Sequence, residues 1–219
     1  MAPLEIRTLV VGPVACNCAI VACTETGQAA IIDPGGNTEA ILAMVKDMGV
    51  KVTHLLHTHA HFDHILATGE VAVATGAPIF VHRDDQSLYE NLPGQGQRFG
   101  FRATRPPAPT QWLVGGETMA VGKLSVMVLH TPGHTPGSVG YYLGGHDPVL
   151  FAGDTLFAES VGRTDFPGGS FADLAASIRT KLYVLPGDTR VIPGHGPETT
   201  IGHEREYNPF ISATAVEGG

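Results

Sequence analysis

Basic residues are scarce in this sequence, and they form no continuous stripe. Of the 219 residues, 13 are Lys or Arg and 21 are Asp or Glu, which gives a formal net charge of −8 at pH 7. Apart from a small group at Arg98, Arg102 and Arg105, the positive charges are scattered along the chain. Proteins bind nucleic acids chiefly through clustered positive charge that contacts the phosphates. The sequence therefore predicts no nucleic-acid partner.

Long hydrophobic runs are absent as well. A membrane-spanning helix needs about 20 consecutive apolar residues. The N-terminal stretch instead carries an early acid, Glu5, and its apolar part is interrupted by Arg7. We therefore expect neither a signal peptide nor a membrane partner.

Cysteine is rare, and its pattern excludes several kinds of site. The three cysteines, Cys16, Cys18 and Cys23, form no C-x-x-C pair. Their odd number and spacing disfavour a zinc knuckle or a redox motif. We expect them to be small buried hydrophobic side chains in an N-terminal hairpin. A cytoplasmic location, where thiols stay reduced, fits this usage best.

The composition that remains is that of a globular protein, with 43% hydrophobic and 16% charged residues. No repeat or low-complexity tract interrupts it, so we expect residues 1–219 to form a single domain. Short β-rich runs alternate with amphipathic stretches, which predicts an α/β fold of mixed sheets covered by helices. Strands are predicted within residues 6–11, 17–23, 29–36, 52–57, 78–82, 125–130, 139–143, 148–153 and 189–194, and helices within 37–49 (with Asn37 as N-cap), 63–76 and 171–185.

Residues 91–110 are rich in Gly and Pro and show no periodicity, which predicts a long loop. The loop carries three arginines together with Phe99 and Phe101. This charge and aromatic content suits a lid that contacts an anionic substrate, and a merely solvated loop is the alternative.

The segment HTHAHFDH, residues 57–64, is the strongest chemical signal. It follows a predicted buried strand, so His59 and His61 point the same way, while Asp63 and His64 come round at the start of the next helix. A solvated polar turn is the alternative explanation. Clustering of titratable groups without a compensating ion is costly, so a metal site is favoured.

Three more metal-ligand side chains follow predicted strands farther along the chain. These are His134 in a Pro/Gly turn, Asp154, and His195 in PGHG. Seven ligand-type side chains then gather at one edge of the sheets. Three imidazoles can hold one ion, further groups a second, and a carboxylate can bridge the two. The count therefore favours a dinuclear hydrolytic site.

The motifs THAHFDH, TPGHTPGS, GDTLF and PGHG, in this order, resemble the metallo-β-lactamase-fold hydrolase superfamily. The resemblance covers nearly the whole chain and implies a four-layer αβ/βα sandwich with the site at the sheet edge. It implies that His59, His61 and His134 bind one metal, that Asp63, His64 and His195 bind a second, and that Asp154 bridges them. Two divalent ions are expected, with zinc first and iron or manganese as alternatives.

Within the superfamily, the stretch from GDTLF to FPGG and the tail after PGHG resemble short glyoxalase II-type thioester hydrolases. This implies a small-molecule thioester substrate, such as a glutathione conjugate, attacked by a metal-bridging hydroxide that Asp63 helps to orient. The sequence contains no G-x-S-x-G elbow, and no cysteine lies near these histidines in sequence. An acyl-enzyme mechanism is therefore not expected. Only residues 196–219 follow His195, so the helical glutathione-binding domain of glyoxalase II is expected to be missing. A monomer or a homodimer fits equally well.

Three other functions stay open. GRTDF is also similar to persulfide dioxygenases, which implies a single iron held by His59, His134 and Asp154. A lactonase or β-lactamase would use the same two-metal hydroxide on a cyclic ester or amide. A non-catalytic binding module is disfavoured because all seven ligand-type residues are present.

Several polar residues are weaker candidates. Arg163 and Tyr142 are substrate-contact candidates by the resemblance, with surface pairing and core packing as the alternatives. His57 is expected to support the site or the packing without binding metal. Asp33 either orients a ligand imidazole or caps the glycine turn that follows it. His130 lies near enough to His134 in sequence to support it.

Overall fold

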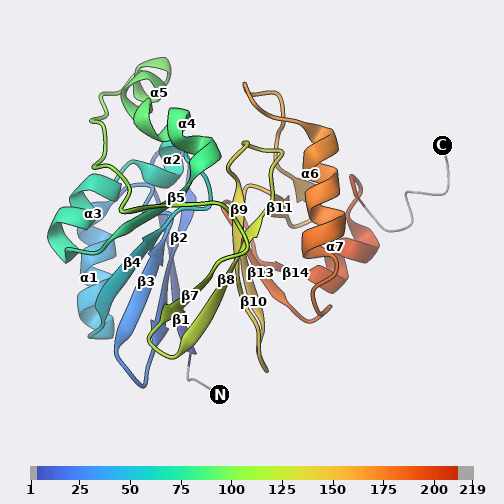
Figure 1. Ribbon diagram of the computed structural model, residues 1–219, viewed down its shortest axis with the longest axis horizontal. Helices are drawn as coiled ribbons and strands as arrows, with labels where there is room; N and C mark the ends of the chain where they lie inside the picture. Colours follow the sequence, from blue (N-terminus) through green and yellow to red (C-terminus); the bar gives the residue numbers. More distant parts are fainter. Residues whose placement is uncertain (1–3, 212–219) are drawn as a thin grey trace.

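The computed structural model describes residues 4–211 and shows two six-stranded sheets packed face to face, with helices on both outer sides (Figure 1). The first sheet has the order β1-β2-β3-β4-β5-β6, and the second has the order β14-β13-β10-β9-β8-β7. This is the four-layer αβ/βα sandwich that the sequence predicts, and the prediction is confirmed. The strands of the first sheet are β1 (Leu4–Val11), β2 (Cys16–Cys23), β3 (Gln28–Ile32), β4 (Lys51–Leu56), β5 (Ile79–His82) and β6 (Gln111–Leu113).

The second sheet is also mixed, but within residues 4–211 only one of its strand pairs is parallel. Strands β10 and β13 are parallel, and both β8 and β10 run antiparallel to β9. Strands β8, β10 and β13 therefore end at one edge, as the parallel strands β3, β4 and β5 do in the first sheet. The strands are β7 (Thr118–Val121), β8 (Leu124–His130), β9 (Val139–Leu143), β10 (Val149–Gly153), β13 (Arg190–Pro193) and β14 (Thr199–Thr200), with a separate hairpin of β11 (Leu156–Phe157) and β12 (Ser160–Val161).

Helices cover the outer faces of both sheets (Figure 1). The first sheet carries α1 (Thr38–Met48), α2 (Phe62–Ile65), α3 (Thr68–Thr75), α4 (Gln86–Glu90) and α5 (Leu92–Arg98). The second sheet carries α6 (Phe171–Ser177), its π-helical continuation (Ile178–Leu182) and α7 (Ile201–Tyr207). Within residues 4–211, no helix is long and apolar enough to cross a membrane.

Side chains alternate between the two faces of each strand, so the two sheets form three apolar layers: one between the sheets and one under the helices on each outer side. In β2, Cys18 and Ile20 pack toward the helices of the first sheet, whereas Ala19 and Val21 pack toward the second sheet. Successive side chains of a strand point to opposite faces, so a strand covered on both sides is apolar throughout. The three cysteines are free and buried within this β1–β2 hairpin region, as expected.

Two local predictions are wrong, and a third holds only in part. Residues 63–76 form two short helices, α2 and α3, and not one. The predicted loop contains α5, a helix without an apolar period that begins at a proline-containing turn and buries the polar side chain of Gln95. Asn37 is the N-cap residue of α1, as predicted, with a left-handed φ of 52°, but its side chain does not cap the helix, because Oδ1 accepts a hydrogen bond from Gly12 N.

The core between the sheets sets the stability of the fold. Phe151 in β10 is 2% exposed and packs within this middle layer. Replacing Phe151 by Ala should lower the free energy of unfolding by about 3–5 kcal/mol, because apolar burial is lost and a cavity remains. Chemical denaturation measures the change. The control Phe210→Ala, at a side chain that is 53% exposed, should change stability far less.

Candidate metal centre

The segment that follows β4 leaves the sheet as buried, irregular backbone. Residues 57–61 belong to no helix or strand, and α2 begins at Phe62. Side chains from other elements bind this backbone in addition to the backbone contacts of His57 with Phe80 and of Thr58 with Val139. The Thr58 amide donates to Asp33 Oδ1 at 2.7 Å, and the Ala60 amide donates to Asp85 Oδ2 at 2.8 Å. The segment is thereby held in one conformation.

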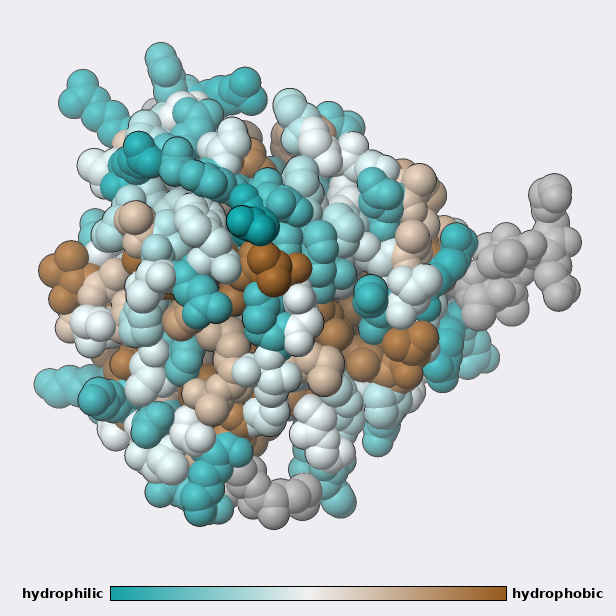
Figure 2. Space-filling model, viewed as in Figure 1, coloured by the Kyte–Doolittle hydropathy of each residue, from teal (hydrophilic) through white to brown (hydrophobic). Residues whose placement is uncertain are grey.

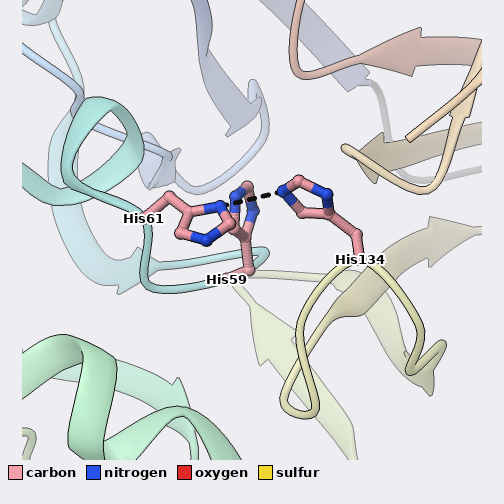
Figure 3. Close-up of side chains that lie close together, drawn as sticks. All are labelled: His59, His61 and His134. Atoms are coloured by element: carbon pink, nitrogen blue, oxygen red, sulfur yellow. Dashed lines mark hydrogen bonds between the residues drawn. The ribbon is translucent and has the colours of Figure 1, made fainter. Parts of the chain in front are cut away.

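The first group of side chains is a triad of imidazoles (Figure 3). One nitrogen from each of His59, His61 and His134 lies within 4.8 Å of the others. His61 Nδ1 is 2.9 Å from His134 Nε2, and the His59 ring lies edge-on to both, with centroids 4.8 and 4.7 Å away. Two of these residues come from the loop after β4, and the third from the turn after β8. The triad therefore joins the two sheets.

The second group lies beside the first and contains a carboxylate. Atoms of Asp63, His64 and His195 lie within 4.8 Å of one another. His195 Nε2 is 3.1 Å from Asp63 Oδ2 and 3.3 Å from His64 Nε2. His195 follows β13, so this group again draws on both sheets.

Asp154, directly after β10, lies between the two groups. Its Oδ2 is 3.6 Å from His134 Nε2 in the first group and 3.7 Å from His195 Nε2 in the second. Its Oδ1 is 3.4 Å from His64 Nε2. All seven residues singled out from the sequence are thus brought together, with Asp154 in the middle.

Three of these imidazoles form hydrogen bonds to the protein through Nδ1, the ring nitrogen that faces away from the cluster. His64 Nδ1 donates to Asp33 Oδ2 at 2.9 Å, since a carboxylate can only accept. His134 Nδ1 donates to the carbonyl of Arg163 at 2.8 Å, and His195 Nδ1 donates to a backbone carbonyl at 3.1 Å. A protonated Nδ1 leaves Nε2 as the lone-pair nitrogen, which turns Nε2 toward the cluster. Of the two roles considered for Asp33, the structure favours orientation of a ligand imidazole.

The inner atoms lack the partners that buried polar groups need. His59 Nε2 and Asp154 Oδ1 are buried with no hydrogen bond of acceptable geometry. Burial and the neighbouring imidazoles hold the pKa of His59 well below its usual range, and burial lowers the pKa of His61 to about 3. The neighbouring imidazoles hold the pKa of Asp154 below its usual range although burial opposes this. A divalent metal requires neutral imidazoles and ionised carboxylates, and His59, His61 and Asp154 fit that requirement.

Backbone packs closely against this centre. A β-carbon on Gly194, the glycine of PGHG before His195, would lie 2.1 Å from Asp154 Oδ1 and 2.7 Å from His64 Cε1. No side chain larger than hydrogen fits there without displacing one of the two residues.

The weaker candidates lie elsewhere or contact the centre indirectly. Tyr142 does not join the cluster, since it packs on the outer face of the second sheet below α6. The Arg163 side chain forms an ion pair with Asp165 and lies 4.0 Å from the Phe166 ring centroid, while Phe166 packs edge-on against His61. Arg163 thus reaches the cluster through its carbonyl.

His57 is buried away from the cluster. Its nitrogens contact Thr68 Oγ1 and the Phe80 carbonyl at 2.8 and 3.1 Å. This agrees with the packing role expected from the sequence. His130 supports the turn of His134 by donating to the Pro136 carbonyl at 2.9 Å.

Sequence reasoning missed two features near the site. Cys16 Sγ lies 3.6 Å from His64 Nδ1, so a cysteine does approach the cluster in space, although none does in sequence. Burial raises the pKa of this thiol to about 11, which keeps it an unreactive thiol. His82, Asp84 and His130 form a further group of ligand-type residues, but the two imidazole rings are stacked 17° from parallel. Parallel rings do not direct their lone pairs at one point.

A family model described as the metallo-beta-lactamase superfamily matches residues 11–195. The chain belongs to this superfamily. It is 40% identical over 199 residues to the hydroxyacylglutathione hydrolase GloC of Haemophilus influenzae, covering 90% of this chain and 93% of that protein. The fold and the superfamily predicted from the motifs are confirmed.

Two solved structures have closely similar folds. The B3 metallo-beta-lactamase BLEG-1 superposes with a TM-score of 0.87 at 38% identity, covering 94% of this chain and 99% of that chain. TTHA1623, in a di-iron-bound form, has a TM-score of 0.84 at 39% identity, covering 93% and 99%. Members of the family thus bind divalent metals, and the metal differs from the zinc expected here in at least one of them.

The surface beside the centre is hollowed. Figure 2 shows a notch in the upper edge of the molecule, between the region of α5 and the loop that precedes α6 (Figure 1). On the α5 side, Phe99 is 56% exposed and packs on Phe62, the residue after His61, with ring centroids 4.4 Å apart. On the other side lies Phe166. Aromatic rings therefore flank the approach to the cluster.

Gly194→Ala tests the close packing at the centre. The added methyl group should push Asp154 or His64 aside and weaken zinc binding by at least about 10-fold, the smaller effect seen when a metal's surroundings are altered. Chelator competition on the metal-free protein measures the affinity. In the control Gly187→Ala, the nearest atom is the mobile Arg205 guanidinium at 3.3 Å, and zinc affinity should not change.

Proposed function

We propose that the protein is a two-metal hydrolase of small thioesters, of the glyoxalase II type. The observation that carries this proposal is the position of Asp154, whose carboxylate faces an imidazole of each group. In the proposal, His59, His61 and His134 hold one divalent ion, and Asp63, His64 and His195 hold the other. Zinc is the proposed metal, with iron as the alternative that a di-iron relative supports.

Two ions bound in this way would lower the pKa of a shared water and polarise the thioester carbonyl. The chain itself supplies position and charge. Asp154 stays ionised and balances the positive charge of both sites. Asp63 Oδ2 lies at the edge of the second group, 3.1 Å from His195 Nε2, where it would accept a hydrogen bond from the attacking water and orient it.

The leaving group needs little help from the protein. Hydrolysis adds water across the C–S bond and gives an acid and a thiol. A free thiol has a pKa of about 8.5, so the sulfur departs as a thiolate without a strong general acid. This agrees with the cluster, in which the inner imidazole nitrogens are lone-pair donors and not acids.

The similarity to GloC supports a thioester of glutathione as the first substrate to try. The flanking rings of Phe99 and Phe166 would contact the acyl group or the thiol. A β-lactam is the second candidate, because BLEG-1, at 38% identity over nearly its whole length, is named a B3 metallo-beta-lactamase. Both substrates present a carbonyl to the same pair of ions, so the assay must compare them directly.

Asp154→Asn tests the two-metal proposal. Mutation of a residue that only supports a metal ligand typically lowers metal affinity or activity by about 10- to 100-fold. Loss of the shared carboxylate itself should therefore lower turnover of S-lactoylglutathione by more than about 100-fold. Metal content, measured on the same samples, should fall with it. Asp147→Asn, at an exposed carboxylate that pairs with His146, should change neither quantity.

The substrate panel decides between the candidates. S-lactoylglutathione, a cephalosporin and glutathione persulfide are offered to the zinc-loaded and the iron-loaded protein. Faster turnover of the thioester supports the proposal, and faster turnover of the β-lactam replaces it with the second candidate. Oxygen consumption with the persulfide, or full activity in a metal-free sample, would refute hydrolysis by two ions.

A further inference from the structure

A carboxylate outside the seven-residue cluster holds two of its loops together. Asp85 ends the 3₁₀ turn (Arg83–Asp85) after β5 and is fully buried. Its Oδ2 accepts hydrogen bonds from Ala60 N at 2.8 Å and from Thr135 Oγ1 at 2.9 Å. Its Oδ1 accepts one from Gly137 N at 2.7 Å. Three donors from two separate loops thus converge on one side chain.

These partners are neighbours of the first imidazole triad. Ala60 stands between His59 and His61, and Thr135 directly follows His134. Asp85 therefore binds both chain segments that supply the triad, one from each sheet, without contacting an imidazole of the triad. A shift of one segment relative to the other would stretch these hydrogen bonds.

The surroundings of Asp85 are built to fit it. A β-carbon on Gly137 would lie 2.7 Å from Asp85 Oδ1, so only glycine leaves room for the carboxylate. On the opposite side of the same peptide segment, Gln95 Nε2 donates to the Ala60 carbonyl at 2.9 Å. Both polar groups of Ala60 are therefore held by side chains.

The burial of Asp85 also requires an explanation. A buried carboxylate is costly unless it is fully hydrogen-bonded, and an apolar side chain would avoid the cost. Among residues 4–211, no Lys, Arg or His forms an ion pair with it. The carboxylate of Asp85 instead accepts three hydrogen bonds at fixed positions, and hydrogen bonds to a charged acceptor are stronger than those to a neutral one.

We propose that Asp85 is a positioning residue that sets the distance between the loop of His59 and His61 and the turn of His134, and so prepares the first triad for its ion. The inference rests on the proposed two-metal function. It assigns Asp85 to one of the two ions only, because its contacts reach neither Asp63 nor His195.

Zinc titration of the metal-free protein against a chelator tests this assignment. His61→Ala and His195→Ala serve as references that identify which affinity belongs to which ion. Asp85→Ala and Asp85→Asn should weaken zinc binding at the first site by about 10- to 100-fold, with the second affinity close to wild type. If Asp85→Ala fails to fold, Thr135→Val and Thr135→Ser replace it. Val removes the hydroxyl donor and should weaken the first site, whereas Ser keeps the donor and should restore it.

Ser177→Ala is the matched control. Ser177 Oγ donates to the Pro132 carbonyl at 2.8 Å, so this change removes a buried hydrogen bond from the same turn without touching the loop of His59. An equal loss of zinc affinity in this control, or equal weakening of both sites by Asp85→Ala, would show general destabilisation and overturn the proposal. If the wild type binds two ions and the Asp85 variants bind both as tightly, only this inference fails. If the wild type takes up no ion, the proposed function fails and this inference with it.

Discussion

The centre depends on how the buried backbone of residues 57–62 satisfies its hydrogen-bonding groups. The β4 ladder ends at Leu56, and an unpaired buried amide costs about 1–3 kcal/mol. Two backbone contacts continue past the ladder, from His57 N to the Phe80 carbonyl and from Val139 N to the Thr58 carbonyl, and side chains bind several of the other groups. Asp33 binds the amide of Thr58, Asp85 that of Ala60, Gln95 the carbonyl of Ala60 and the amide of Phe62, and Tyr141 the carbonyl of His57. These contacts give an irregular segment the rigidity of a strand.

Rigidity at this place brings an electrostatic cost. The same contacts bring imidazole rings to within 4.1–4.8 Å of one another, where burial and the neighbouring imidazoles oppose protonation of His59 and His61. Asp154 is ionised in their midst with one oxygen lacking a hydrogen bond. A cation is the simplest partner that satisfies both kinds of atom at once. Support of the backbone and affinity for metal are thus two results of one arrangement.

The sequence predicts those features of the fold and the cluster that are encoded by local patterns of residues. Strands are recognised by apolar runs, and ligand-type residues stand where those runs end, so the layered fold and the seven-residue cluster follow from spacing. Asp85 and Gln95 carry no such signal. Each is a single polar residue whose partners in the loops of the imidazole triad lie 25 to 52 positions away, and its role exists only once the loops meet. The helix α5 was missed for the same reason, because a buried glutamine takes the place of an apolar period.

The division between centre and rim explains why membership of the superfamily leaves the substrate open. The residues that hold the cluster lie within and between the sheets, bound by many buried contacts. Phe99 directly follows α5 and Arg163 lies on the loop before α6, and their side chains take no part in holding an imidazole. Changes there would alter what reaches the cluster without disturbing the cluster itself. In the proposed function, substrate choice would therefore depend on these two surface segments, and the chemistry on the sheet edge beneath them.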